Sequence, residues 1–276
     1  MKDHLRKLKH LTLSRGISGI TSSSRVLPDF LIIGAKRCGT TTLYENLSEH
    51  PCIEKSAHDN IGFFNDNFLL GINWYKSHFP TMQKKKEIKK KYGKFVTYDV
   101  TTSYMRRNDT AIKIKETIPD VKIIAILRNP VDRAYSEYNT NSKNESSNET
   151  FENLVLQEIN TYHKIKDHDT EILIKKLKLI GKGLYEIQLK KWFEIFSRDS
   201  ILILATEEFA IEPNSLYSKI FRFLELPEYK IKNTQKFNKN TYSIMSDKTR
   251  QILLDFYSSE NKKLFNLIGQ EFDWKK

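Results

Sequence analysis

Short apolar runs alternate with helical patterns along this chain, and that alternation restricts the folds open to it. Phe30–Ile33 reads FLII, which is typical of a strand buried on both faces. Three later runs are also predicted strands: Phe95–Tyr98, Val121–Leu127 and Ile201–Leu204. The helical patterns are Thr40–His50, Ile112–Ile118, Pro130–Asn139, Phe151–Tyr162, Leu184–Phe196, Pro213–Leu224 and Lys248–Ile268. Strands separated by helices predict an α/β fold of three layers, with a central parallel β-sheet flanked by helices.

We predict a single folded domain over residues 26–276, preceded by a flexible, basic tail over residues 1–25. Ser, Gly and Thr interrupt the second half of this tail, so it lacks the apolar core of a secretory signal. The 276 residues include 16 Phe and 13 Tyr, so the chain can bury a large core. This composition excludes collagen-like, low-complexity and disordered chains. We predict no membrane span, because no apolar run approaches about 18 residues.

The formal charge of +12 needs either a partner or a large solvated surface. Much of it lies in two runs, Lys84–Lys91 (KKKEIKKK) and Lys175–Lys178 (KKLK). Such runs most often keep a chain soluble, but a nucleotide, a nucleic acid or an acidic glycan would also be attracted to them. The runs alone leave both interpretations open.

The cysteine content bears on the compartment and on metal binding. Cys38 and Cys52 are the two cysteines of the sequence, and neither lies in a metal-ligand pattern. We therefore predict no metal site and no disulfide framework. Together with the absence of a recognisable targeting signal, this usage favours a reducing compartment, and we expect a cytoplasmic location.

The loop after the first predicted strand carries the strongest chemical signal. It reads Gly34-Ala35-Lys36-Arg37-Cys38-Gly39 and leads into Thr40-Thr41-Thr42 at the start of a helix. Unpaired N–H groups and the helix dipole favour an anion there, and the glycines permit a tight turn. The spacing matches the beginning of a P-loop, so the expected fold is P-loop-like. However, Thr40 stands where a P-loop NTPase has its lysine, and the basic residues are inside the loop.

A second basic residue ends the third predicted strand. Arg128 follows Val121–Leu127, at the position where a triphosphatase would carry a metal-binding aspartate. Side chains at the carboxyl ends of parallel strands face the ligand crevice, and Ser136 lies two helical turns further along. Arg128 and Ser136 would form a second phosphate site, separate from the loop, unless Arg128 instead caps a helix or pairs with Asp132. Two such sites predict a nucleotide with phosphates at both ends of its ribose.

These two motifs resemble those of a known enzyme family. Pro28–Pro51 and Leu127–Asn139 are similar to the two cofactor motifs of the sulfotransferases that use 3′-phosphoadenosine 5′-phosphosulfate (PAPS). The resemblance is closest to the carbohydrate group that includes the heparan sulfate N- and O-sulfotransferases. It covers residues 28–274 in collinear order. The remaining matching segments are Phe63-Phe64, Gly71–Pro80, Gly183–Tyr185, Lys191–Phe193 and Asn261–Trp274.

The resemblance implies the roles of the cofactor-binding residues. It places the 5′-phosphosulfate on Arg37, Cys38, Gly39, Thr40, Thr41 and Thr42, and the 3′-phosphate on Arg128 and Ser136. Arg37, with Lys36 beside it, would stabilise the charge on the leaving phosphate, where the heparan-type enzymes usually have lysine. The reaction yields 3′-phosphoadenosine 5′-phosphate (PAP) and needs no metal. A loop at Lys232–Lys239 would cover the cofactor, with Lys236 or Lys239 reaching a phosphate.

The catalytic base follows less directly from the resemblance. The heparan-type pattern has glutamate three residues before the Phe-Phe pair, but this chain has Asn60, which cannot accept the proton. His58 and Asp59 precede it, and either could act as the base or simply belong to a polar loop. Val100 replaces the lysine of a second pattern, whereas Tyr104 is retained and is expected to line the acceptor pocket.

The predicted function is therefore transfer of a sulfuryl group from PAPS to a hydroxyl, or an amine, of a carbohydrate acceptor. The expected partners are a small nucleotide and a glycan or glycoconjugate, without nucleic acid. Two alternatives remain. A P-loop phosphotransferase would bind magnesium–ATP, and a non-catalytic relative would bind PAP or PAPS but lack the base, as Asn60 suggests.

Overall fold

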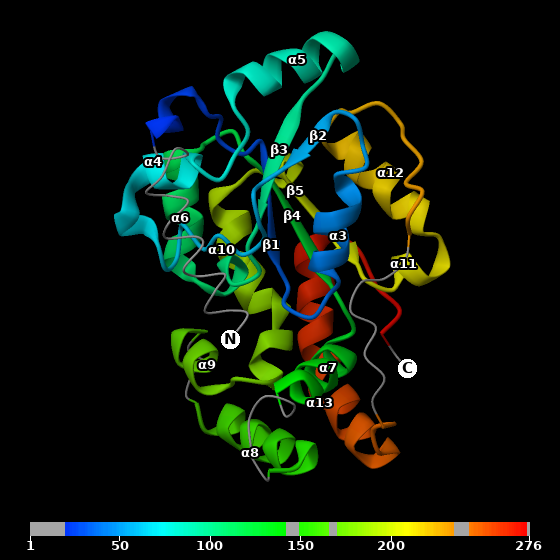
Figure 1. The fold of residues 1–276 in the computed structure, drawn as a ribbon. Helices are drawn as coiled ribbons and strands as arrows, with labels where there is room; N and C mark the ends of the chain where they lie inside the picture. The colour runs from blue at the N-terminus through cyan, green and yellow to red at the C-terminus, as the bar shows by residue number, and fades with distance from the viewer. Residues whose placement is uncertain (1–19, 142–148, 166–169, 235–242, 275–276) are drawn as a thin grey trace.

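The computed structural model describes residues 20–141, 149–165, 170–234 and 243–274 (Figure 1). Its centre is a sheet of five parallel strands in the order β2-β3-β1-β4-β5. The strands are β1 (Phe30–Gly34), β2 (Ile53–Lys55), β3 (Val96–Val100), β4 (Lys122–Leu127) and β5 (Ile201–Ala205). The predicted P-loop-like α/β fold with helices around a parallel sheet is confirmed.

Helices cover both faces of this sheet. In Figure 1, α3 and α12 lie on one side of the strands, and α6 and α10 lie on the other. The helices are α3 (Thr40–Leu47), α4 (Gly71–Lys76), α5 (Met82–Tyr92), α6 (Asn108–Thr117), α7 (Pro130–Asn141), α8 (Phe151–Lys164), α9 (Thr170–Lys176), α10 (Tyr185–Ile195), α11 (Glu208–Ile211), α12 (Pro213–Phe223) and α13 (Asp247–Ile268). Shorter 3₁₀ turns are η1 (Ser22–Ser24), η2 (Phe68–Leu70), η3 (Tyr104–Arg106), η5 (Ile180–Gly183) and η6 (Arg198–Ser200). Among the described residues, none of these helices has the length and apolar content needed to cross a membrane.

The strand order brings two loops together. Phe30 at the start of β1 pairs with Tyr98 of β3 on one side and with Lys122 of β4 on the other. After β1 the chain moves outward to β2, and after β3 it crosses to β4 on the opposite side. The strand order therefore reverses beside β1, and parallel sheets bind ligands at the carboxyl edge of such a point. The loops that follow β1 and β4 lie at this edge.

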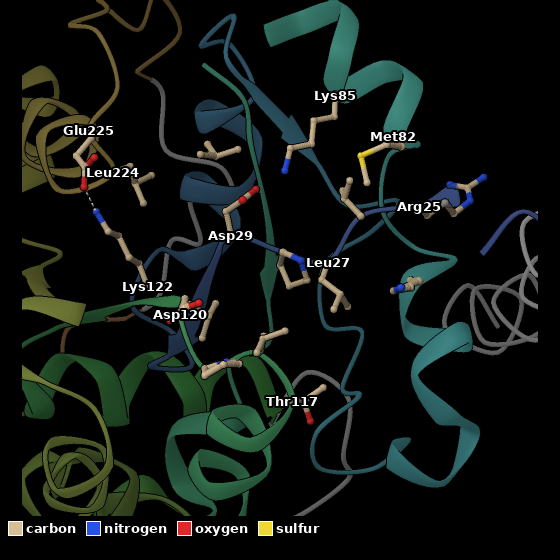
Figure 2. Close-up of a pocket in the computed structure, with 17 residues that line it drawn as sticks. Arg25, Leu27, Asp29, Met82, Lys85, Thr117, Asp120, Lys122, Leu224 and Glu225 are labelled. Atoms are coloured by element: carbon tan, nitrogen blue, oxygen red, sulfur yellow. Dashed lines mark hydrogen bonds and ion pairs between the residues drawn. The ribbon is translucent and has the colours of Figure 1, made fainter. Parts of the chain in front are cut away.

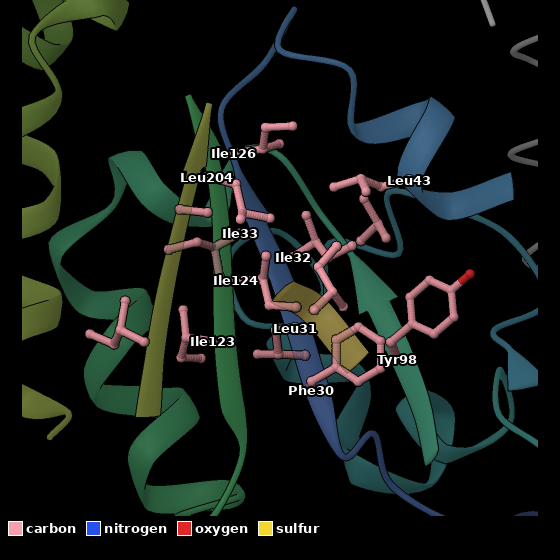
Figure 3. Packing of buried hydrophobic residues seen from close by; sticks show 14 of the residues in the cluster. Phe30, Leu31, Ile32, Ile33, Leu43, Tyr98, Ile123, Ile124, Ile126 and Leu204 are labelled. Atoms are coloured by element: carbon pink, nitrogen blue, oxygen red, sulfur yellow. The ribbon is translucent and has the colours of Figure 1, made fainter. Parts of the chain in front are cut away.

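The core is built on both faces of the central strands. Every residue of β1 is buried, as are Ile123 to Leu127 of β4. Figure 3 shows the aliphatic side chains of β1 and β4 against Leu43 of α3, with Tyr98 stacked on Phe30 at a ring distance of 4.9 Å. The apolar runs of the sequence are thus the strands that need cover on two sides.

Helix α5 was not predicted from the sequence, because it consists mostly of lysines and lacks an apolar face. The run Lys84–Lys91 lies within it, and Ile88 is its one buried residue. Thr81 caps its start by accepting a hydrogen bond from the N–H of Lys84, and Gly93 ends it at a φ of 81°. The run is therefore an exposed helical surface.

The predicted tail includes a packed part. Ser22–Ser24 form η1, Arg25 pairs with Thr81, and an Arg25 guanidinium nitrogen donates to the carbonyl of Phe79 at 2.6 Å. Residues 1–19 lie outside the described part of the chain. The domain boundary at residue 26 stays a prediction.

We expect Ile124→Ala in β4 to lower the free energy of unfolding by about 2–5 kcal/mol, because it leaves a cavity in a fully buried layer. Ile112→Ala is the matched control, since that isoleucine is exposed on α6. Urea titrations followed by fluorescence measure both. Equal losses in the two variants would contradict this account of the core.

Candidate functional site

The loop between β1 and α3 turns sharply at two residues. Arg37 has a φ of 72° and Gly39 a φ of 90°, both in the left-handed region that costs a side-chain-bearing residue about 1–2 kcal/mol. Gly39 caps α3, and the N–H of Cys38 donates to the carbonyl of Ala35. The first N–H groups of a helix have no partner within it, so this end of α3 favours an anion.

The three predicted polar ligands meet at this loop. The Nε of Arg37 donates to the hydroxyl of Ser136 at 3.2 Å, and a guanidinium nitrogen of Arg128 lies 3.4 Å from the carbonyl of Arg37. We expected Arg128 and Ser136 to form a site separate from the loop. The side chain of Arg37 contacts Ser136 and its carbonyl contacts Arg128, because α7 places Ser136 against the loop, and the second phosphate site stays a prediction. One continuous cationic edge results.

Other side chains hold this edge in place. The hydroxyl oxygen of Thr206, after β5, lies 2.6 Å from the carbonyl oxygen of Cys38 and 2.8 Å from that of Leu127, so its one hydrogen is shared between the two carbonyls. The hydroxyl of Tyr185 donates to the carbonyl of Arg128 at 2.8 Å. These bonds fix the backbone of both loops. Neither residue was predicted as part of the site, although Tyr185 belongs to a segment that carries the family resemblance.

The loop residues differ in what they can offer a ligand. Cys38 is fully buried, and burial raises the pKa of its thiol to about 12, so only its backbone faces the loop. Thr40 and Thr42 are also buried, whereas Thr41 is partly exposed. A ligand would therefore meet mainly backbone N–H groups and the Arg37 side chain. The predicted Lys236 and Lys239 lie outside the described residues.

The buried carboxylate of Glu137 lies behind the loop and forms an ion pair with Lys36, the second basic residue of the loop. Glu137 is 1% exposed and accepts from Arg133 at 2.6 Å and from the amine of Lys182, and the amine of Lys36 lies 3.4 Å away. Burial alone would raise the pKa of Glu137, but the charges of Arg133 and Lys182 outweigh it and hold the pKa at about 2. Our sequence reasoning missed this group. Its signal is the four-residue spacing of Arg133 and Glu137 on one helix.

The segment Ala57–Phe64 runs along the end of β3. The N–H of Asn60 donates to the carbonyl of Val100 at 2.6 Å. In His58, Nδ1 lies 3.1 Å from the carbonyl of Asp59 and Nε2 lies 3.1 Å from Nδ1 of His78. Both ring nitrogens of His58 are thus engaged. The Asp59 carboxylate has no hydrogen bond or ion pair to the described residues, and the side chain is half-buried.

The contact of His58 with a carbonyl shows which of its ring nitrogens carries a hydrogen. A carbonyl only accepts, so Nδ1 of His58 carries the hydrogen that it donates to the backbone carbonyl of Asp59. One hydrogen lies between Nε2 of His58 and Nδ1 of His78, carried by one of the two nitrogens. His58 would therefore have to break one of these contacts before taking a proton from an acceptor. Both predicted bases stay predictions.

The expected place of Tyr104 in an acceptor pocket is not supported by the structure. Its side chain is fully buried, and its hydroxyl donates to Asp99 at 2.9 Å. Burial is possible because η3 turns the ring inward beneath the Ala57–Phe64 segment. Tyr104 therefore supports this segment from inside, and in this structure no acceptor could reach its hydroxyl.

A cavity of about 620 Å³ lies at the opposite end of the sheet (Figure 2). Asp29, before β1, and Lys122, at the start of β4, are among its lining residues, so it faces the amino ends of the strands. None of the predicted site residues lines it. Within the described residues, no three His, Cys, Asp or Glu side chains are grouped as a metal site.

Known proteins match most of the chain. The sulfotransferase domain family matches residues 27–276. The membrane-associated sulfotransferase kil1 of Dictyostelium discoideum is 23% identical over 90% of this chain and 67% of its own length. The bifunctional heparan sulfate N-deacetylase/N-sulfotransferase 1 of Caenorhabditis briggsae is 24% identical over 90% of this chain, which spans only 31% of that relative. A sulfotransferase structure from Alicyclobacillus acidocaldarius has a TM-score of 0.69 at 24% identity, covers 91% of this chain and all of its own, and confirms the fold.

The expectation of a cytoplasmic location is contradicted by these matches. The relative kil1, which aligns with nine tenths of this chain, is a membrane-associated protein. Our inference relied on the two cysteines and on the lack of a recognisable targeting signal. Neither feature reports on a compartment, because a domain without disulfides can fold on either side of a membrane.

We predict that Glu137→Gln lowers the free energy of unfolding by about 3–5 kcal/mol, since it leaves Arg133 buried without its counter-charge. The control is Glu225→Gln, which removes an ion pair to Lys122 from a carboxylate that is 70% exposed. Thermal unfolding at neutral pH measures both variants. A Glu225→Gln effect as large as that of Glu137→Gln would show that burial does not set the value of these pairs.

The pKa of Asp99 gives a second expectation. Burial raises it from 3.8 to about 6, although hydrogen bonds from Thr101, Tyr104 and Tyr75 oppose the shift. The folded protein therefore keeps this proton where the unfolded chain loses it. The stabilisation is fully present below about pH 4 and is lost as the pH rises through about 6, in total about 3 kcal/mol. Denaturant titrations of wild type and Asp99→Asn from pH 4 to 7 should diverge by that amount, and parallel curves would contradict it.

Proposed function

Because the chain belongs to the sulfotransferase family, whose domain matches residues 27–276, we propose that it transfers a sulfuryl group from PAPS to a carbohydrate hydroxyl. The observation that carries this proposal is the contact of Arg37 with Ser136 and Arg128 at the start of α3. Two guanidinium groups, a buried hydroxyl and the N–H groups of a helix start gather at one sheet edge. We also propose residues 26–276 as one catalytic domain, which the extent of the family match supports.

The residues present fit a doubly phosphorylated nucleotide. The backbone of Cys38 to Thr42 and the Arg37 side chain would hold the 5′-phosphosulfate. Arg128 and Ser136 would hold the 3′-phosphate, and Lys36 is tethered beside them by Glu137. Such a set of cationic and N–H donors, with hydroxyls that can also donate, suits an anion. The phosphosulfate supplies an activated sulfuryl group, and the chain supplies its orientation.

Arg37 has the role of stabilising charge. As the sulfuryl group leaves, negative charge grows on the phosphate oxygen that is left behind. A guanidinium fixed on the loop meets that charge without further reorganisation. Arginine stays protonated at neutral pH, so Arg37 acts as an electrostatic group and does not donate a proton.

Asp59 is the proposed base. The acceptor hydroxyl must lose a proton as its oxygen bonds to sulfur, and a carboxylate without competing hydrogen bonds can accept it. His58 would have to break its contact with the carbonyl of Asp59 or with His78 first. Asn60 cannot replace the glutamate of the heparan-type pattern, because an amide is not basic enough to take the proton. Its amide oxygen lies 3.3 Å from both the N–H and the hydroxyl of Thr102.

A carbohydrate acceptor is supported by the relatives. One of the matching proteins is a heparan sulfate N-deacetylase/N-sulfotransferase, although this chain spans less than a third of its length. The departures at Asn60 and Val100 from the heparan-type pattern argue for an acceptor or a base arrangement that differs from that of the heparan enzymes. The family match removes the basis for the P-loop phosphotransferase alternative.

We expect Arg37→Ala to abolish transfer and Arg128→Ala to weaken nucleotide binding by at least about tenfold, which corresponds to the loss of one charge-assisted contact. Turnover of labelled PAPS with a panel of sugars measures transfer, and calorimetry with PAP measures binding. The control is Arg222→Ala, since that side chain is 80% exposed on α12. Unchanged binding and rate in both site variants would refute the assignment. A wild-type protein that binds PAP but transfers nothing would be a non-catalytic relative.

A further inference from the structure

The buried carboxylate of Asp99, on β3, accepts hydrogen bonds from three hydroxyl groups next to the proposed site. Asp99 has no exposed surface. Its Oδ2 accepts from the hydroxyls of Tyr75 at 3.0 Å and Tyr104 at 2.9 Å, and its Oδ1 accepts from the hydroxyl of Thr101 at 2.8 Å. These donors come from α4, η3 and the end of β3, so one carboxylate joins three elements.

Two of the hydroxyls extend the network to the segment that carries Asp59. The oxygen of Thr101 accepts from the N–H of Gly62 at 3.2 Å, and the oxygen of Tyr104 accepts from the N–H of Phe64 at 3.4 Å. Each oxygen of Asp99 is thus one hydroxyl away from the backbone of Ala57–Phe64. An ionised carboxylate can only accept, so it fixes both hydroxyls as donors toward itself and leaves their lone pairs for the two N–H groups.

The first half of this segment is held by backbone bonds to β3 and to the residues after α4. The N–H of Asn60 donates to the carbonyl of Val100, and the N–H of Ala57 donates to the carbonyl of His78 at 2.8 Å. Asp59 lies between these attachments. The chain that follows Asp59 is tied to Asp99 at Gly62 and Phe64, so the position of Asp59 depends on that network as well as on these two backbone bonds.

We propose that Asp99 is a positioning residue for sulfuryl transfer, which holds the Ala57–Phe64 segment so that Asp59 can take the proton of the acceptor. The inference rests on the proposed function and adds to it a group that touches neither donor nor acceptor. The donor loop has attachments of its own outside this network, to Thr206, Tyr185 and Glu137.

The groups that face Asp99 decide its charge. They are Tyr75 from α4, Tyr104 from η3 and the Asp59 carboxylate, whose charge raises the pKa of Asp99 further. Burial and the charge of Asp99 keep the pKa values of both tyrosines well above 10, so they stay protonated donors. Protonation of Asp99 below about pH 6 gives the carboxyl a donor hydrogen and disturbs the order of the network.

The test compares Asp99→Asn with Asp29→Asn. Asp29 is a partly buried carboxylate bonded to β3, since it accepts from the N–H of Thr97 at 2.8 Å, but it lies at the other end of the sheet. For Asp99→Asn we expect kcat to fall at least tenfold, with the KM for PAPS and the Kd for PAP within about threefold of wild type. Asp29→Asn should leave all three unchanged.

Two readouts separate positioning from general loss of structure. Hydrogen exchange at the amides of Gly62 and Phe64 should become faster in Asp99→Asn, while exchange in the donor loop stays as in wild type. The wild-type kcat should fall as the pH drops through about 6, and this change should be reduced in the variant, which is neutral at every pH. Tyr104→Phe keeps the ring and removes one link, so it should show a smaller version of the same defect if Asp99→Asn does not fold.

The outcomes are distinguishable from failure of the proposed function. Wild-type kcat and wild-type exchange at Gly62 and Phe64 in either foldable variant would overturn the positioning role. A lower kcat together with an equally weakened affinity for PAP would also overturn it, since the donor site would then depend on Asp99. The exchange measurement needs no turnover, so it tests the network even if the wild-type protein transferred nothing.

Discussion

All five strands of the sheet run in the same direction, and this constraint decides where chemistry can occur. Their carboxyl ends share one edge, so the residues that follow β1, β3, β4 and β5 meet there although they are up to about 170 positions apart in the chain, as with Cys38 and Thr206. Arg37 and Arg128 are brought together in this way. Reversal of the strand order beside β1 then opens the edge to a ligand.

Like charges gathered at one edge repel each other, and the fold compensates for this repulsion in two ways. Glu137 is buried behind the loop and neutralises part of the charge of Arg133, Lys36 and Lys182. Backbone carbonyls receive the remaining donors, as when Arg128 approaches the carbonyl of Arg37. The outer surface of Arg37 is left to meet an anionic ligand. A second buried carboxylate, Asp99, serves the neighbouring segment through hydroxyl groups and has no cation among the partners described here.

The sequence predicted the parts of the structure that depend on local pattern. Strands β1, β4 and β5 are apolar runs and were placed within a residue or two, and the loop before Thr40 was identified by its glycines and its position between strand and helix. Two elements, β2 and α5, were not predicted, because apolar periodicity does not define them. Strand β2 has only three residues, and Ile53 is its one buried position, so it leaves little periodicity. Helix α5 is defined by its caps, because lysines hide its single buried residue.

The sequence was enough to propose which residues form the site, but not which of them touch each other. Motif resemblance singled out Arg37, Arg128 and Ser136, but only the packing of α7 shows that Arg37 touches Ser136. Tyr104 and the thiol of Cys38 are buried and so cannot contact a ligand, which no sequence pattern reveals.

The most direct test of the account is calorimetry of the wild-type protein in EDTA with PAP and with adenosine 5′-phosphate. If both ends of the nucleotide are held, PAP should bind at least about tenfold more tightly, since the 3′-phosphate adds charge-assisted contacts. Equal affinities, or binding of magnesium–ATP in place of PAP, would contradict it.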